Sequence, residues 1–210
     1  LNRFCASSLQ TTRMAFHAIK AGEGDQYIAA GVEAVSRASG APDFEFHKKL
    51  DGSEGSVYNV YIPMGLTAEN VAERCNVSRE AQDEWAVTSQ NRAVEARDNG
   101  HFDREIVPVT TPDGTEVTQD DGPRPGTTME KLASLNPLHP EIEGFSITAG
   151  NSSGLNDGAT ASIIVGSESA HAPGLEPMAV IKWVASAGAP PQDTGLGPAR
   201  PRPTGPVRAR

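Results

Sequence analysis

The stretch from Leu1 to Val32, LNRFCASSLQTTRMAFHAIKAGEGDQYIAAGV, decides the fold class of this chain. Its first half predicts a helix, because its apolar residues recur at helical spacing. These residues are Leu9, Phe16 and Ile19. The helix is expected to end at Gly22, since glycine readily takes the left-handed conformation that closes helices. Residues 26–32 form an apolar run that predicts a short buried strand. A helix followed directly by a strand is typical of α/β proteins.

Cys5 lies directly before this predicted helix, whose start either Ser7 or Ser8 can cap. The first N–H groups of a helix have no backbone partner, and together with the helix dipole they stabilise an anion. The position therefore favours a thiolate, which is a strong nucleophile. A buried and inert cysteine is the alternative interpretation of the same residue. Cys5 is the candidate catalytic residue of the sequence.

Composition and charge disfavour several kinds of partner. The 210 residues carry a formal net charge of -9, so long-range repulsion disfavours nucleic acid and anionic membranes. No apolar run is long enough to span a bilayer. The two cysteines, Cys5 and Cys75, have no metal-ligand spacing and fit a reducing compartment, so we expect a cytoplasmic protein. Because Leu1 is not a start methionine and no secretory leader is recognisable, we expect residues before it in the complete protein.

Two helices with clear start signals are predicted in the middle of the chain. Residues 37–63 are rich in Ser, Gly, Pro and charge, which predicts an excursion over the surface. Thr67 is expected to cap a helix over residues 68–75, and Ser78 a longer helix through residue 98. The further expected elements are short strands at 105–110 and 116–118, a short helix from 127, apolar strands at 159–167 and 178–187, and a helical turn near 168–171.

Residues 189–210 differ in kind from the rest of the chain. They hold six of its 16 prolines and four arginines, with almost no apolar periodicity. This composition predicts a segment that does not pack. We interpret it as a disordered or non-native terminus, and a basic tail for an acidic partner is the alternative.

Several segments, in order along the chain, resemble motifs of the thiolase family, whose members make or cleave 3-oxoacyl-CoA. They are NRFCASSLQ (2–10), AGVEAVS (30–36), MGLTAENVA with SREAQD (64–72 and 78–83), RPGTT (124–128) and TAGNSSGLNDG (148–158). The resemblance covers about residues 1–188. It implies an incomplete α/β thiolase-like layered fold of helices and a mixed sheet, with an inserted α+β loop domain.

The resemblance also divides the chain into domains. Residues 1–36 and 141–172 would be part of the thiolase N-terminal domain, and residues 37–140 the inserted loop domain. Residues 173–188 would begin the C-terminal domain. Residues 189–210 would be a Pro/Arg-rich tail outside the family, as expected after a shifted reading frame or an incorrectly joined end.

Roles carried over from the resemblance make Cys5 the nucleophile that takes the acyl group from acyl-CoA as a thioester. Acyl-CoA and acetyl-CoA are the implied substrates, and neither a cofactor nor a metal is implied. A guanidinium suits the nucleotide end of coenzyme A, although an exposed arginine is otherwise only solvated. The complete enzyme is expected to be a homo-oligomer, either a dimer or a tetramer. The residues that would contact coenzyme A are Met64, Arg124, Ala149, Ser153 and Leu155.

Three segments typical of the family do not occur in the sequence: Gly-His-Pro, Cys-x-Gly and Asn-Glu-Ala-Phe. Only His139 precedes a proline, but Leu138 stands where the glycine should be, so we do not assign it as a base. Cys75 lacks the following glycine, and a packing role is expected for it. Pro63 stands where some members carry histidine, which could shift substrate preference.

The first hypothesis is a thiolase-type acyltransferase of fatty-acid metabolism and β-oxidation, which interconverts acyl-CoA plus acetyl-CoA with 3-oxoacyl-CoA plus CoA. Since the three segments are missing, this chain is expected to be inactive or impaired. A second hypothesis is a non-catalytic thiolase-like protein that binds acyl-CoA or lipid or acts in assembly. A ketosynthase is a third, but the loop-domain motifs count against it.

Overall fold

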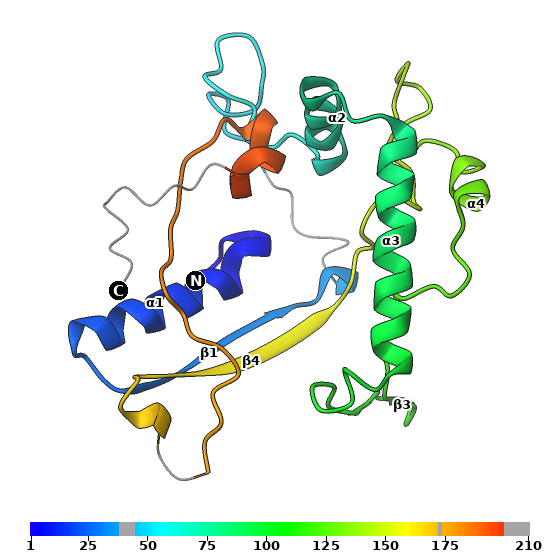
Figure 1. Ribbon diagram of the computed structural model, residues 1–210. Coiled ribbons are helices and arrows are strands. Elements are labelled where there is room, and N and C mark those ends of the chain that lie inside the picture. The colour runs from blue at the N-terminus through cyan, green and yellow to red at the C-terminus, as the bar shows by residue number, and fades with distance from the viewer. Residues whose placement is uncertain (38–44, 172–173, 200–210) are drawn as a thin grey trace. The chain divides into compact units, whose positions relative to one another are not determined.

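The computed structural model describes residues 1–37, 45–171 and 174–199 (Figure 1). These residues form two units. Unit 1 contains residues 1–37, 45, 155–171 and 174–187, and unit 2 contains residues 46–154 and 188–199. Each unit joins segments that are distant in the sequence, so each is held together by contacts that the sequence pattern alone does not reveal.

Unit 1 is a helix on a two-stranded sheet. Its main elements are α1 (Ser7–Ala21), β1 (Gln26–Glu33) and β4 (Gly158–Val165). The strands are antiparallel, with Gln26 opposite Val165 and Glu33 opposite Gly158. Short 3-10 turns, η1 (Phe4–Ala6), η2 (Val35–Arg37) and η3 (Ser169–His171), complete the unit.

Small side chains allow α1 to lie close to β1. Ala15 of the helix and Ala29 of the strand are buried. At Gly31 the approach is closest, because a Cβ there would lie 1.9 Å from the Oγ of Ser8. The helix ends as predicted at Gly22, which has φ +77° and donates its N–H back to the last turn. The predicted helix and strand of the opening stretch are therefore present, but the prediction that the strand is buried is wrong, since only Ala29 of β1 is buried.

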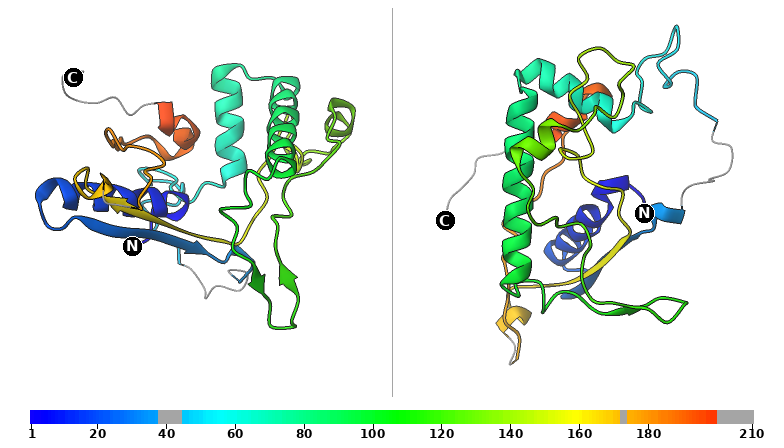
Figure 2. Two further views of the ribbon diagram at one scale, coloured as in Figure 1. Left: turned by 60° about the horizontal axis from the view of Figure 1, so that its bottom comes forward. Right: turned by 90° about the vertical axis from the view of Figure 1, so that its right-hand side faces the viewer.

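Unit 2 is built around two helices, α2 (Met64–Cys75) and α3 (Arg79–Asp98). Its remaining elements are β2 (Val109–Thr110), β3 (Glu116–Val117), α4 (Met129–Ala133) and the 3-10 segment η4 (Pro191–Ala199). The Oγ of Ser78 accepts the N–H of Ala81, so Ser78 caps α3 as predicted. The hairpin of β2 and β3 projects from the C-terminal end of α3 (Figure 2).

The structure corrects three predictions about these elements. Helix α2 begins at Met64, and Thr67 lies buried inside its first turn, where its hydroxyl donates to the Met64 carbonyl. Residues 178–187 form no strand among the described residues, because an apolar run needs a neighbouring edge to satisfy its backbone groups. Both sheets in the described part of the chain are two-stranded and antiparallel, so the expected mixed sheet does not appear there.

The expectation that residues 189–210 do not pack is wrong for residues 191–199. Asp193 of η4 is buried and forms an ion pair with Arg74 of α2. The Asn70 side chain donates to the carbonyl of Gln192 at 3.1 Å. Polar side chains of α2 thus hold η4, a kind of contact that apolar periodicity does not detect. Residues 200–210 lie outside the described residues.

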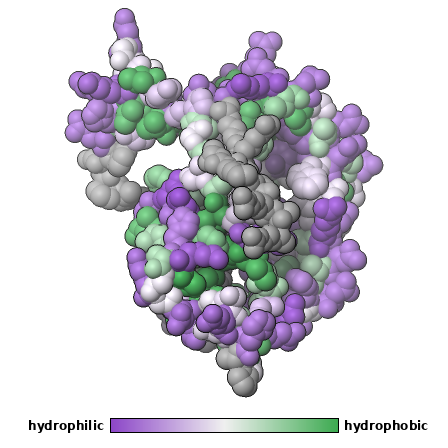
Figure 3. All heavy atoms as spheres, turned by 60° about the vertical axis from the view of Figure 1, so that its left-hand side comes forward, coloured by the Kyte–Doolittle hydropathy of each residue, from purple (hydrophilic) through white to green (hydrophobic). Residues whose placement is uncertain are grey.

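The apolar core is small and much apolar surface is exposed. The buried hydrophobic residues are Ala15, Ala29, Leu132, Phe145 and Ile147. Larger apolar side chains such as Ile28, Val32 and Ile163 of the sheet in unit 1 are more than two-thirds exposed. Apolar patches interrupt the hydrophilic surface on the face drawn in Figure 3. In the described ranges no helix combines the length and the apolar character that a membrane crossing requires.

Candidate active site

Cys5 lies in a strained turn that leads directly into α1. Phe4 has φ +49°, the left-handed conformation, which is costly for a bulky aromatic residue. The Oδ1 of Asn2 accepts the N–H of Phe4 at 2.7 Å. The Oγ of Ser7 accepts the N–H of Arg3 at 2.8 Å and donates to the carbonyl of Phe4 at 2.7 Å. Three side-chain hydrogen bonds therefore stabilise the turn that presents Cys5.

The start of α1 differs from the prediction in one respect. Ser7 is the first residue of the helix and Ala6 takes the N-cap position, where it supplies no side-chain hydrogen bond. Ser7 is thus used for the preceding turn, and Ser8 lies against β1. Cys5 is an exposed free cysteine two residues before the first residue of α1. The N-cap residue Ala6 has no side-chain acceptor for the first N–H groups of this helix. The candidate nucleophile therefore lies at the N-terminal end of α1.

In unit 2 the most buried stretch of chain is residues 145–148, where Phe145, Ile147 and Thr148 are nearly inaccessible. Residues 137 and 138 pair with it, since Leu138 donates its N–H to the carbonyl of Ile147 at 2.8 Å. The next residue, Ala149, is exposed. The chain therefore passes from the interior of unit 2 to its surface within one residue.

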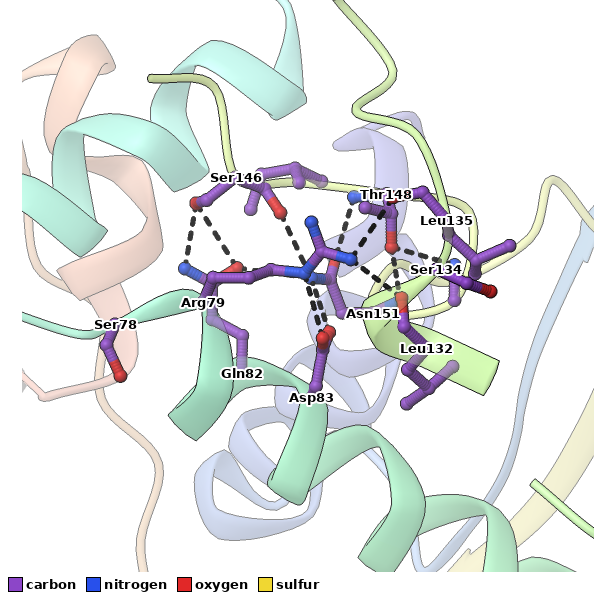
Figure 4. Close-up of polar contacts among 12 residues, drawn as sticks. Ser78, Arg79, Gln82, Asp83, Leu132, Ser134, Leu135, Ser146, Thr148 and Asn151 are labelled. Atoms are coloured by element: carbon purple, nitrogen blue, oxygen red, sulfur yellow. Dashed lines mark hydrogen bonds and ion pairs between the residues drawn. The ribbon is translucent and has the colours of Figure 1, made fainter. Parts of the chain in front are cut away.

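Thr148 and Asn151 close this turn with reciprocal side-chain hydrogen bonds (Figure 4). The Oδ1 of Asn151 accepts the N–H of Thr148 at 2.8 Å. The Oγ1 of Thr148 accepts the N–H of Gly150 at 3.1 Å and that of Asn151 at 3.3 Å. Two backbone positions flanking Ala149 are thus fixed by side chains within the turn.

Helix α3 fixes the same turn through a buried ion pair. Asp83 is 1% exposed, and its carboxylate accepts from the Nε of Arg79 at 2.9 Å and from the Nδ2 of Asn151 at 3.1 Å. The guanidinium of Arg79 also donates to the carbonyls of Leu132 and Leu135 at 2.7 and 3.3 Å (Figure 4). A buried charge is tolerated only when it is paired and hydrogen-bonded, as it is here.

Helix α2 contributes a second carboxylate. The Oε1 of Glu69 accepts the N–H groups of Ser146 and Ile147, the latter at 2.9 Å. The Ser146 hydroxyl bonds to Glu69 and to Gln82 of α3, each at 2.9 Å. Side chains from two helices therefore hold the backbone of residues 146–151. None of Glu69, Asp83 and Asn151 was predicted as a functional residue, because their pairing is long-range and leaves no local signal in the sequence.

The predicted coenzyme A residues are distributed over both units. Ala149 and Ser153 share one exposed loop in unit 2, where the Ser153 hydroxyl donates to the adjacent Gly154 carbonyl. Met64 is the first residue of α2 and is 65% exposed. The start of this helix lies near the same loop segment, since a Cβ at Gly65 would be 3.5 Å from the Phe145 ring.

The other predicted contacts lie elsewhere. The backbone N–H of Arg124 donates to the Oε1 of Gln90 at 2.8 Å, and Arg124 is exposed. Leu155 is 87% exposed and belongs to unit 1, as does Cys5. Among the described residues, no hydrogen bond joins the predicted contact residues to one another. Their roles stay predictions.

The structure also shows the contacts of Cys75 and His139, which the sequence analysis did not assign to catalysis. Cys75 ends α2 and is exposed, so the packing role expected for it is wrong. The Nδ1 of His139 lies 2.9 Å from Glu141, and its ring edge contacts Phe145. The backbone N–H of Glu141 and then the His139 side chain lower the pKa of the Glu141 carboxyl.

Across residues 1–37, 45–171 and 174–199, no group of three or more His, Cys, Asp or Glu could hold a metal ion.

Fold and site together define an α/β protein with an exposed cysteine, presented on a strained turn at a helix start, as its candidate nucleophile. The thiolase N-terminal domain matches residues 1–168, and the chain belongs to the thiolase family.

Individual relatives agree with this membership. A probable acetyl-CoA acyltransferase of Staphylococcus epidermidis is 38% identical to this chain, in an alignment that covers 94% of this chain and 53% of that protein. The human peroxisomal 3-ketoacyl-CoA thiolase is 42% identical over 207 residues, which cover 95% of this chain and 48% of that protein. The solved dimeric peroxisomal thiolase of Saccharomyces cerevisiae has a TM-score of 0.80 and 33% identity, with 95% of this chain and 51% of that one covered. The chain thus has a thiolase-like α/β fold and spans about half the length of these relatives.

Proposed function

We propose that this chain carries the nucleophile of a thiolase-type acyltransferase and that its reaction begins with a thioester on Cys5. The observation that carries the proposal is the exposed Cys5 on a strained, hydrogen-bonded turn before α1. Strain of this kind persists only where the surroundings enforce it, and it is concentrated at functional sites. The names of the relatives, acyltransferases and thiolases, support the same chemistry.

In the proposed step the Cys5 thiolate attacks the carbonyl carbon of an acyl-CoA thioester. A bond forms between that carbon and the Cys5 sulfur, and the bond to the coenzyme A sulfur breaks. Coenzyme A leaves as a thiolate and takes up a proton from solvent. Nothing is oxidised or reduced, and the exchange of one thioester for another is nearly balanced in energy.

Coenzyme A thioesters are the proposed substrates, and no further cofactor is needed for this step. Their binding is proposed for the residues predicted from the sequence, which are Met64, Arg124, Ala149, Ser153 and Leu155. The three segments missing from the sequence would supply the base and part of the oxyanion stabilisation. Acyl transfer to Cys5 and carbon–carbon bond formation by this chain should therefore both be slow, by about 10³-fold or more for each group that is missing.

The decisive experiment is to incubate the 210-residue chain with acetyl-CoA and map the adduct by mass spectrometry. Cys75 is a matched control within the chain, because it too is exposed and reduced. We expect acetylation at Cys5 that Cys5→Ala abolishes and Cys75→Ala leaves intact. Equal labelling of both cysteines would overturn the nucleophile assignment. Binding of acetyl-CoA with no adduct would favour the non-catalytic alternative.

We also infer a homo-oligomer, since the yeast neighbour is a dimeric thiolase and apolar side chains of the sheet in unit 1 are exposed. Light scattering during gel filtration tests this, and a monomer at micromolar concentration would contradict it. A cytoplasmic location stays a prediction from the cysteine usage.

A further inference from the structure

We propose that Asn151 is a positioning residue for coenzyme A, because its side chain fixes the exposed loop that bears Ala149 and Ser153. The inference rests on the proposed function, in which this loop contacts the pantetheine. Asn151 itself is not the contact. It acts through the backbone of the turn that it closes.

The hydrogen bonds of Asn151 use both ends of its amide. Its Oδ1 accepts the Thr148 N–H, and its Nδ2 lies 3.1 Å from Asp83, 3.2 Å from the Ser146 carbonyl and 3.3 Å from Gln82. An amide nitrogen has only two hydrogens, so these three acceptors share them. One side chain thus ties the turn to α3 and to the segment that precedes it.

The hydrogen bonds of Asn151 restrict the position of Ala149, because the turn passes from the interior of unit 2 to its surface at this residue. Thr148 is 0% exposed, whereas Ala149 is at the surface. The backbone groups on either side of Ala149 are held by Thr148 and Asn151, so Ala149 has little freedom to shift. A displacement of about 1 Å in a binding loop is enough to cost much of the affinity or rate that depends on it.

Gly150 adds a second restraint at the same place. A Cβ there would come within 2.5 Å of the terminal methyl groups of Leu132 and Leu135, so a larger residue would require both side chains to shift. The loop is therefore clamped on one side by packing against leucines and on the other by Asn151. A substitution at Asn151 removes only hydrogen bonds and leaves the packing of Gly150 unchanged. Asn151 is therefore a more selective position for a test than Gly150.

The charged groups that face the amide come from two helices. Asp83 of α3 accepts from the amide and is itself paired with Arg79, and Glu69 of α2 holds the neighbouring Ser146 and Ile147. Asn151→Asp keeps the acceptor for Thr148 but places a second carboxylate beside Asp83. Two adjacent carboxylates share a proton and titrate as a pair, so protonation restores a donor between them.

The test measures the affinity of the 210-residue chain for acetyl-CoA by calorimetry at pH 7.5 and again near pH 5.5. We expect Asn151→Asp to weaken binding about 10-fold or more at the higher pH, as the loss of a charge-assisted hydrogen bond implies. The affinity should recover at the lower pH, relative to the unchanged chain at each pH. Asn136→Asp, at an exposed asparagine of the same unit, is the matched control and should change neither value.

Hydrogen exchange of residues 145–153 is measured on the same proteins. Faster exchange confined to this peptide in Asn151→Asp supports the proposal, and unchanged affinity at both pH values overturns it. Weakened binding with normal exchange also overturns it, since the loop would then be undisturbed. If the unchanged chain binds no acetyl-CoA, the proposed function itself fails and this inference falls with it.

Thr148→Val provides a second route should Asn151→Asp fail to fold. It removes the hydroxyl that accepts the N–H groups of Gly150 and Asn151 and keeps the branched shape. We expect weaker acetyl-CoA binding and faster exchange of the loop, with no recovery at low pH because no proton can replace the lost acceptor. Binding equal to that of the unchanged chain would overturn the proposal.

Discussion

The turn that carries Cys5 and the segment over residues 145–151 hold their backbones in opposite ways. In the turn, side-chain hydrogen bonds reach at most seven residues along the chain, and the groups involved are exposed. In the segment, Asn151 reaches Asp83 across 68 residues and Ser146 reaches Glu69 across 77, in partly buried surroundings. The candidate nucleophile is thus held by hydrogen bonds within its own turn, whereas the candidate binding loop is held by the fold of its unit. Changes at the turn should alter reactivity more than stability, and changes around the segment should do the reverse.

The strongest test of this contrast is Asp83→Ala. Removing the carboxylate leaves the guanidinium of Arg79 and the amide of Asn151 without their buried partner. We expect the free energy of unfolding to fall by about 2–3 kcal/mol, because buried partners of Asp83 are lost while Arg79, 27% exposed, keeps its two carbonyl acceptors. Urea denaturation followed by circular dichroism measures it.

Glu84→Ala is the control for this substitution, because Glu84 is the next residue of α3 and is exposed. Its effect should stay within about 0.5 kcal/mol. If the two variants unfold at the same urea concentration, the ion pair does not stabilise the segment and the contrast between the two regions fails.

A smaller loss is expected where α1 meets β1. A methyl group at Gly31 would collide with the Oγ of Ser8, so Gly31→Ala should lower the free energy of unfolding by about 1–3 kcal/mol. Ser8→Ala removes the colliding atom, and the double variant should recover most of the loss. A thermal denaturation series of the single and double variants gives the coupling. Additive effects would show that the helix does not rest on the strand at this point.

The contrast also explains which features the sequence could predict. Signals that act within a few residues were interpreted correctly: the end of α1 at Gly22, the cap of α3 at Ser78, and the cysteine before a helix. The ordered motifs also identified the family. Each of these depends on residues that are neighbours in the chain.

Features that depend on distant partners were missed or wrong. Residues 178–187 are apolar enough for a strand, but no described strand pairs with them. Asp193 packs in a segment whose composition predicts disorder, because Arg74 of α2 offers it a charge. The bonds of Asn151 to α3 belong to the same class. The sequence proposed a nucleophile and a binding loop, and only the fold shows what holds that loop in place.

At the Cys5 turn itself, Ser7→Ala removes an acceptor for the N–H of Arg3 and a donor to the Phe4 carbonyl. Both groups are exposed and can bond to water, so the free energy of unfolding should fall by only about 1 kcal/mol. The left-handed Phe4 loses its support, and the acetylation rate of Cys5 should therefore drop while the chain stays folded.

Single-turnover acetylation followed by mass spectrometry measures that rate. Ser167→Ala, at an exposed serine of the same unit, is the control and should leave both values unchanged. A large loss of stability in Ser7→Ala with normal acetylation would reverse the assignment of roles to the two regions.

The smallest expected effect is on the stability of the chain at acid pH, through the contact of Ser36 with Asp157 in unit 1. The hydroxyl of Ser36, and then its backbone N–H, donate to Asp157 at 2.6 and 2.9 Å and hold the pKa of this carboxyl below its usual value. A carboxyl with a lowered pKa in the folded state stabilises the fold above its unfolded pKa, and this contribution is lost as the pH falls through the folded value.

Asp157→Asn removes that titration and should flatten the pH dependence of the melting temperature below about pH 4, where an ordinary aspartate protonates. The exposed Asp25→Asn in the same unit should leave the slope as it is. Because the Ser36 and Asp157 contact is exposed, solvent screens it and the change should be small. A steep acid transition that survives Asp157→Asn would point instead to other carboxyls with a lowered pKa, such as Asp51 and Asp113 of unit 2, which accept hydrogen bonds first from the side chains of Ser53 and Thr111.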